Sequence, residues 1–139
     1  MTPLSLRNGP PREPRAEARG IVFLPRSIDK FRAALPGGDL GPYGVTGLTT
    51  RMLEKLGISE DEMMNAVGEA PSEEAVVEFV LSKAPEDGIT AWNQFILTRV
   101  PREGRREELF ADYPWLERAT EQSLLAVDLL REDDRHTFM

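Results

Sequence analysis

The chain has 139 residues, of which 40% are hydrophobic and 29% are charged, values typical of one soluble globular domain. The absence of cysteine excludes disulfides, thiolate metal sites and a cysteine nucleophile, and the single histidine, His136, excludes a multi-histidine metal site. The net charge of −7 disfavours nucleic acid as a partner, because nucleic-acid binding needs a basic surface. We therefore expect no metal and no cofactor.

No apolar run reaches the roughly 20 residues that a membrane helix needs. The N-terminal stretch is polar, basic and rich in proline, which is unlike a secretory signal. These features predict a soluble, acidic, cytoplasmic protein that contacts no membrane.

Residues 1–19 are interpreted as a proline-rich basic arm, and residues 20–139 as a single helical domain. Four prolines block regular helix in the arm and remove backbone hydrogen-bond donors. Leu4 and Leu6 offer two apolar anchors. Composition leaves open whether the arm is disordered or lies extended across the domain.

The apolar run after Gly20 ends at Pro25. It has no second strand-like run to pair with, so we expect a buried extended segment that leads into a helix. Ser27 is the expected N-cap of this helix, because a serine hydroxyl can accept from the free amides of the first turn. Its apolar residues share one face, and Pro36 ends it.

Helical periodicity and capping signals continue to the end of the chain. The expected segments are a helix over 46–56 ending at Gly57, one capped by Ser59 with Glu62, one starting at Ser72 and ending at Pro85, a shorter one capped by Thr90, and a stretch over 104–134 broken near Pro114. The sequence therefore predicts an all-α fold: a single compact bundle of about six or seven short helices with an extended N-terminal arm.

The densest polar segment surrounds the start of the first helix, between Arg26 and Arg32. Helix N-termini attract anions, and an arginine can add a bidentate contact, so this segment is a candidate anion site. The competing interpretation is structural: Asp29 pairs with Arg26 or Arg32 three residues away on its own helix.

Two further places contribute candidates. Tyr43 lies in a turn-rich loop between glycines, and Trp92 precedes a mid-helix asparagine, Asn93. Packing explains a buried tryptophan, whereas Asn93 must bind a neighbouring backbone or a ligand. The hypothetical binding residues are Arg26, Asp29, Lys30, Arg32, Tyr43, Trp92 and Asn93, with no metal ligands and no catalytic residue assigned.

Several segments together resemble a bacterial family catalogued as domain of unknown function 5069. The most specific is Leu-Pro-Arg-x-Ile-Asp-Lys-x-Arg-Ala, which starts at Leu24. The other segments are Leu35-Pro36-Gly37, the Tyr43 loop, Leu56-Gly57-Ile58 and Trp92-Asn93. The resemblance covers Pro11 to about Arg99, and the C-terminal helices match only in character. It implies a domain of this size and no established activity.

The sequence favours a binding or interaction module whose partner is a small anion or a protein. The alternative is a small enzyme that gathers a polar cluster around Asp29 in one pocket, with Arg26, Lys30, Arg32, Tyr43 and Asn93. Nucleic-acid binding through the basic arm ranks third, because the rest of the chain is acidic. The ligand and the oligomeric state stay open.

Overall fold

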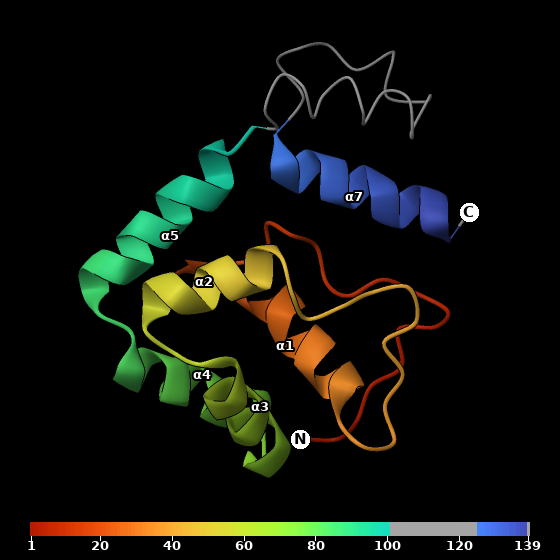
Figure 1. The fold of residues 1–139 in the computed structure, drawn as a ribbon, viewed down its shortest axis with the longest axis horizontal. Helices are drawn as coiled ribbons and strands as arrows, with labels where there is room; N and C mark the ends of the chain where they lie inside the picture. Colours follow the sequence, from red (N-terminus) through yellow and green to blue (C-terminus); the bar gives the residue numbers. More distant parts are fainter. Residues whose placement is uncertain (101–124, 139) are drawn as a thin grey trace.

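The computed structural model describes residues 1–100 and 125–138, and in this part the chain is mainly helical (Figure 1). The elements are β1 (Glu17–Ala18), β2 (Ile21–Val22), α1 (Leu24–Ala34), α2 (Leu48–Leu56), α3 (Glu60–Glu69), α4 (Glu73–Lys83), α5 (Glu86–Thr98) and α7 (Ala126–Thr137). The expected all-α bundle with an N-terminal arm is confirmed, with one small hairpin added to it.

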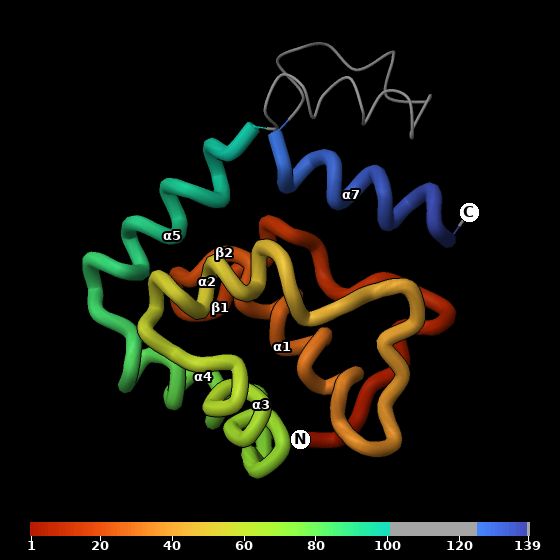
Figure 2. The backbone as a smooth tube through the Cα atoms, viewed as in Figure 1, coloured from red at the N-terminus to blue at the C-terminus, as the bar shows by residue number. Residues whose placement is uncertain are grey.

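The hairpin corrects the expectation that the apolar run after Gly20 finds no strand. β2 pairs antiparallel with β1, with Glu17 opposite Val22 and Ala18 opposite Ile21 (Figure 2). The two turn residues, Arg19 and Gly20, have φ angles of 49° and 83°, the positive pair that a tight hairpin turn requires. A two-residue strand carries no alternating pattern, so the sequence gives no signal for β1.

The first helix begins earlier than expected. Phe23 has a φ of 77° and turns the chain directly from β2 into α1, so Leu24 and Pro25 form the first helical turn. Proline fits there because the first turn needs no donor from it. The prediction that Ser27 caps the helix is therefore wrong. Its hydroxyl lies inside the fold, 3.0 Å from the hydroxyl of Thr49.

The remaining helix boundaries include three confirmed caps and one correction. Ser59 and Glu62 form the predicted capping box, Ser72 caps α4, and Gly57 ends α2 with a φ of 71°. The expected cap at Thr90 is wrong, because α5 begins after Pro85 and Thr90 lies within it, donating to the Glu86 carbonyl. Glu86 and Asp87 lie in the first turn of α5, where acidic side chains are stabilised by the helix dipole, and the sequence prediction did not use this signal.

Helix α1 lies at the centre of the described fold, with α2, α3 and α5 around it (Figure 1). α1 packs on α3, and α2 packs on α5. A Cβ atom at Gly88 would lie 2.4 Å from the carbonyl oxygen of Lys55, so only glycine lets the start of α5 approach the end of α2 this closely. Fully buried apolar side chains of the core include Ile28, Phe31, Met52, Leu56, Met63, Val67, Val76, Val80, Trp92 and Ile96.

The N-terminal arm is ordered and runs antiparallel to α1. Near the end of α1, Leu4 N–H donates to the Arg32 carbonyl, whereas Arg12 lies at its start and contacts the Pro25 carbonyl. Leu6 is buried, as its expected role as an anchor requires. Of the two possibilities that composition left open, the structure has the extended arm across the domain.

The C-terminal part of the chain is described from residue 125. The expected break near Pro114 lies outside the described residues. α7 continues beyond Asp134 to Thr137, and its buried residues are Val127 and Asp134. Leu125 packs against the core as expected, whereas Ala126 and Leu129 are only partly buried. Within residues 1–100 and 125–138, no helix combines the length and the apolar character that crossing a membrane requires.

Two neighbouring side chains of α5 attach the hairpin to the helices. The Trp92 indole N–H donates to the Val22 carbonyl at 2.7 Å. The Asn93 amide accepts from Val22 N–H at 3.0 Å and donates to the Gly20 carbonyl at 2.7 Å. Asn93 thus makes the backbone contact that was one of its two expected roles, and it acts as a side-chain bridge to β2.

Replacing Asn93 with alanine should destabilise the protein by about 1–3 kcal/mol, mainly because the part-buried Val22 N–H loses its acceptor, while the exposed Gly20 carbonyl can bind water instead. Urea denaturation of wild type and N93A measures this difference. Gln94→Ala, at the exposed neighbouring position of α5, is the control and should change the free energy of unfolding by less than about 0.5 kcal/mol. Equal effects of the two substitutions would contradict the bridging role of Asn93.

Candidate functional site

The structure divides the seven candidate residues among three places. Arg26, Lys30 and Tyr43 lie together beneath α7. Asp29 and Arg32 line a groove between α1 and the arm. Trp92 and Asn93 hold the hairpin, as described above.

The first place is centred on a buried ion pair between α1 and α7. The terminal nitrogens of Arg26 donate to the two carboxylate oxygens of Asp134 at 2.7 and 3.2 Å. The Tyr43 hydroxyl donates to the same carboxylate at 2.7 Å. Arg26 is 1% exposed and Asp134 is 7% exposed, so a carboxylate is held by three donors away from solvent.

Lys30 completes this cluster without joining its hydrogen bonds. It lies one turn after Arg26 on α1 and is 8% exposed. Its Nζ lies 6.0 Å from the centroid of the Phe23 ring and 5.9 Å from that of Tyr43. In the described part of the chain, no acceptor binds this ammonium group by a hydrogen bond or an ion pair. The left-handed backbone of Phe23 places its ring under both Arg26 and Lys30.

The cluster holds two cations and one carboxylate, and burial is the largest cause of the pKa shifts of Lys30 and Tyr43. Burial, followed by the charge of Arg26, lowers the pKa of Lys30 to about 8, while Asp134 opposes the shift. Burial, followed by the hydrogen bond to Asp134, raises the pKa of Tyr43 above its usual range. Tyr43 therefore stays a neutral donor at physiological pH. One nitrogen, Arg26 Nε, is buried and has no hydrogen-bond partner within residues 1–100 and 125–138.

The second place is an open groove of about 500 Å³ between the arm and α1. Its charged residues are largely paired with one another. Arg12 donates to Asp29 through its backbone nitrogen and two guanidinium nitrogens. The guanidinium also donates to Glu73 of α4, and this hydrogen bond lowers the pKa of Glu73. Arg32 donates through Nε to the Thr2 carbonyl. The expected pairing of Asp29 with Arg26 or Arg32 on its own helix is therefore wrong, because the arm supplies its partner.

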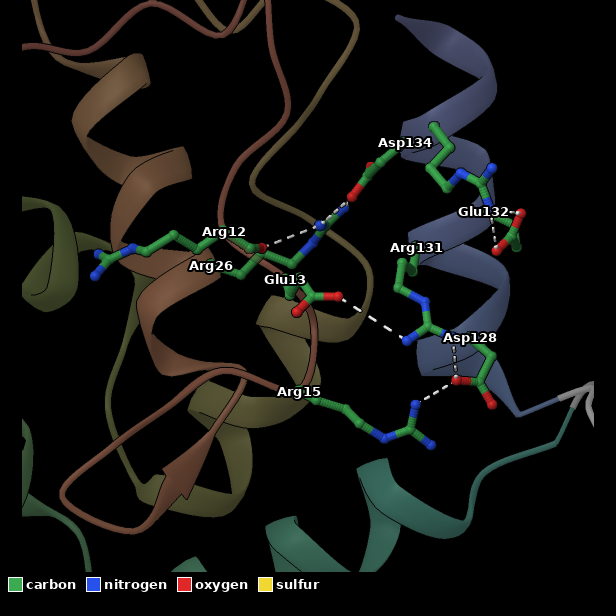
Figure 3. Close-up of polar contacts among 9 residues, drawn as sticks. Arg12, Glu13, Arg15, Arg26, Asp128, Arg131, Glu132 and Asp134 are labelled. Atoms are coloured by element: carbon green, nitrogen blue, oxygen red, sulfur yellow. Dashed lines mark hydrogen bonds and ion pairs between the residues drawn. The ribbon is translucent and has the colours of Figure 1, made fainter. Parts of the chain in front are cut away.

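The arm also connects α1 to α7 (Figure 3). Figure 3 shows polar side chains of the arm and α1 facing those of α7. Arg15 pairs with Asp128, and Arg131 lies 4.0 Å from Glu13. The Phe138 ring stacks on Tyr43, with a distance of 6.3 Å between their centroids. α7 thus contacts the arm and α1 through charged side chains, in addition to the apolar contact of Val127 with the core.

Three important residues were missed in the sequence: Arg12, Asp134 and Phe138. Each lies far along the chain from its partner, and nothing in local spacing links residue 26 to residue 134. The one available signal was chemical, since a buried Arg26 must find an anion, but the sequence does not show that Arg26 is buried. In the described residues, no three acidic or histidine side chains are placed to hold a metal ion.

Replacing Arg26 with methionine should destabilise the protein by about 3–5 kcal/mol, because Asp134 would stay buried without its cation. Chemical denaturation measures this change. The control is Lys83→Met, which removes a pair with Glu62 between two exposed side chains and should change stability by about 0–1 kcal/mol. In the double variant R26M/D134L, most of the lost stability should return. A loss below about 1 kcal/mol in R26M would contradict a buried, bidentate pair.

Replacing Lys30 with methionine should remove a pH dependence of stability above neutral pH. Between pH 7 and 9.5, folded Lys30 loses its proton near pH 8 while the unfolded side chain, with an ordinary pKa of 10.5, keeps it. The unfolded state then binds more protons, so stability from this group rises with pH, by about 2 kcal/mol at pH 9.5. The stability difference between K30M and wild type should shift by this amount across that window, measured by urea denaturation. A constant difference would contradict the lowered pKa.

The comparisons with known proteins give a family and no relative of known function. A search of curated proteins finds no match to this chain. A family model described as Domain of unknown function matches residues 8–135, which includes most of the arm, the Arg26 cluster and Asp134. The match confirms the resemblance seen in the sequence and extends it through α7. The chain belongs to the family Domain of unknown function (DUF5069).

Proposed function

We propose that this chain is a cytoplasmic binding module that takes a small anion, a carboxylate or a phosphate, between Arg26, Lys30 and Tyr43. The observation that carries the proposal is the charge imbalance of the buried cluster, where two cations share one carboxylate. Lys30 is 8% exposed and Arg26 is 1% exposed, so their positive charges are only partly screened by water, and a bound anion would offset the charge that Asp134 leaves unbalanced. The cysteine-free composition suits a reducing compartment.

The ligand chemistry is suggested by the group that the cluster already holds. Asp134 presents a planar carboxylate to two guanidinium nitrogens and one phenol hydroxyl. Charge-assisted bonds of this kind bind carboxylates and phosphates bidentately. An added anion would use the same donors, so Asp134 is its direct competitor, and Lys30 would supply the additional positive charge.

The alternative function, a small enzyme built around Asp29, stays a hypothesis. Asp29 accepts three hydrogen bonds from Arg12, and it lies in the groove rather than beside Lys30 and Tyr43. Asn93 is engaged with β2. The anion-binding proposal needs only residues that lie together in the fold, which is why we favour it.

The test is a thermal-shift series with inorganic phosphate, sulfate, acetate and citrate, with chloride balancing the ionic strength. A ligand that binds only the native state stabilises it, by about 2.7 kcal/mol at a hundredfold excess over Kd. At least one of these anions should raise the Tm of wild type and of the K83M control equally, and should raise that of K30M much less. Asp134→Asn removes the internal competitor, so its apparent affinity should rise about tenfold.

Two outcomes would contradict the proposal. Equal shifts in wild type, K30M and R26M would show a general salt effect, since sulfate and phosphate stabilise many proteins without a site. Weaker binding in D134N than in wild type would show that Asp134 supports the ligand rather than competing with it.

A further inference from the structure

Helices α2 and α5 bring three cations to one aromatic ring on a surface separate from the Arg26 cluster. The ring of Phe95 has the charged groups of Arg99, Lys55 and Arg51 at 5.0, 5.4 and 5.8 Å from its centroid. Arg51 and Lys55 lie one turn apart on α2, and Arg99 lies one turn after Phe95 at the end of α5. We call these four residues the basic surface.

None of the three cations of the basic surface forms an ion pair with a carboxylate of the described residues. Several exposed cations elsewhere do so, since Arg15 pairs with Asp128 and Lys83 pairs with Glu62. The contrast matters because the chain has 24 acidic residues for 17 basic ones. Three like charges within reach of one ring repel each other, so within residues 1–100 and 125–138 the basic surface concentrates positive charge that no ion pair offsets.

Exposed apolar side chains lie in the same part of α5. Leu97 is 38% exposed and Val100 is 59% exposed, and these are the large hydrophobic residues that stand out to solvent in residues 1–100 and 125–138. Phe95 itself is partly buried and packs on Trp92, with 5.8 Å between the ring centroids. Leu97 lies two residues from Phe95 and so on another face of α5, whereas Val100 follows Arg99 just beyond the helix. Apolar area next to the three cations and the aromatic ring therefore comes from Val100, and such a mixture is typical of protein-binding surfaces.

We propose that the basic surface docks an acidic segment of a partner protein, with its carboxylates on Arg51, Lys55 and Arg99. Charge complementarity supports this choice of partner. A nucleic acid fits less well, because its phosphates repeat along the whole strand and would meet the acidic remainder of this chain beyond three cations. A short acidic segment can place its carboxylates on the three cations without extending over the acidic remainder of the chain. The proposal is independent of the anion site at Arg26.

The test is fluorescence anisotropy with a fluorescein-labelled peptide of glutamate and leucine, against the same peptide with glutamine in place of glutamate and against oligothymidine. Wild type should bind the acidic peptide in preference to both others. R51Q/K55Q/R99Q should weaken that binding by about tenfold or more, which corresponds to about 1.4 kcal/mol. The matched control R7Q/R19Q/K83Q removes the same charge elsewhere and should weaken it by less than about twofold.

The outcomes separate the possible occupants. Equal weakening by the two triple variants would overturn the proposal, because it would show attraction by overall charge alone. Tighter binding of oligothymidine than of the peptide, lost in R51Q/K55Q/R99Q, would overturn it in favour of nucleic acid. Absence of peptide binding to wild type would also overturn it. The double variant R51Q/K55Q changes only exposed side chains of α2 and decides the question if the triple variant does not fold.

Discussion

The buried pair between Arg26 and Asp134 is the interaction on which the arrangement of the described fold depends. It joins the first helix to the last across 108 residues of sequence, and Tyr43 adds a third donor from the loop between α1 and α2. α7 also packs on α5 through apolar side chains, with Val127 buried in the core and Leu130 packed against it. The bidentate pair between Arg26 and Asp134 also sets the direction in which α7 lies. Apolar contacts do this less specifically.

The charge imbalance of the candidate site follows from the spacing of two cations on α1. Arg26 and Lys30 lie one turn apart on α1, so both point toward the same region, and a single carboxylate faces them. Phe23 contributes through its backbone, since its positive φ places the ring beneath both cations. A bulky residue in this conformation is uncommon and strained, and surrounding contacts must hold it there. The Trp92 ring against its edge and the Phe23 N–H bond to Ala16 do so.

Interactions between residues close in sequence made much of the fold predictable, whereas contacts between residues distant in sequence could not be predicted. The caps at Ser59 and Ser72 and the glycine at the end of α2 act within a few residues, so their signals are complete in the sequence. Ser27 misled the prediction because Phe23 turns the chain earlier, which no propensity indicates. For the candidate site, Arg26, Lys30 and Tyr43 were predicted from the sequence and lie together, whereas Asp134 on α7, which accepts from Arg26 and Tyr43, was not predicted. Asp29 was assigned a neighbour on its own helix, whereas the arm supplies it.

The position of the arm has a consequence for the order in which the fold forms. Arg12, Glu13 and Arg15 lie between α1 and α7, so residues near one end of the chain must be in place for those near the other end to dock. Contacts of this sequence separation close long loops, so we expect them to form after the helices over 24–98 have packed. Interactions absent from the transition state govern the rate of unfolding rather than the rate of folding. We therefore expect contacts of the arm and α7 to set the unfolding rate of this protein, and with it the lifetime of the native state.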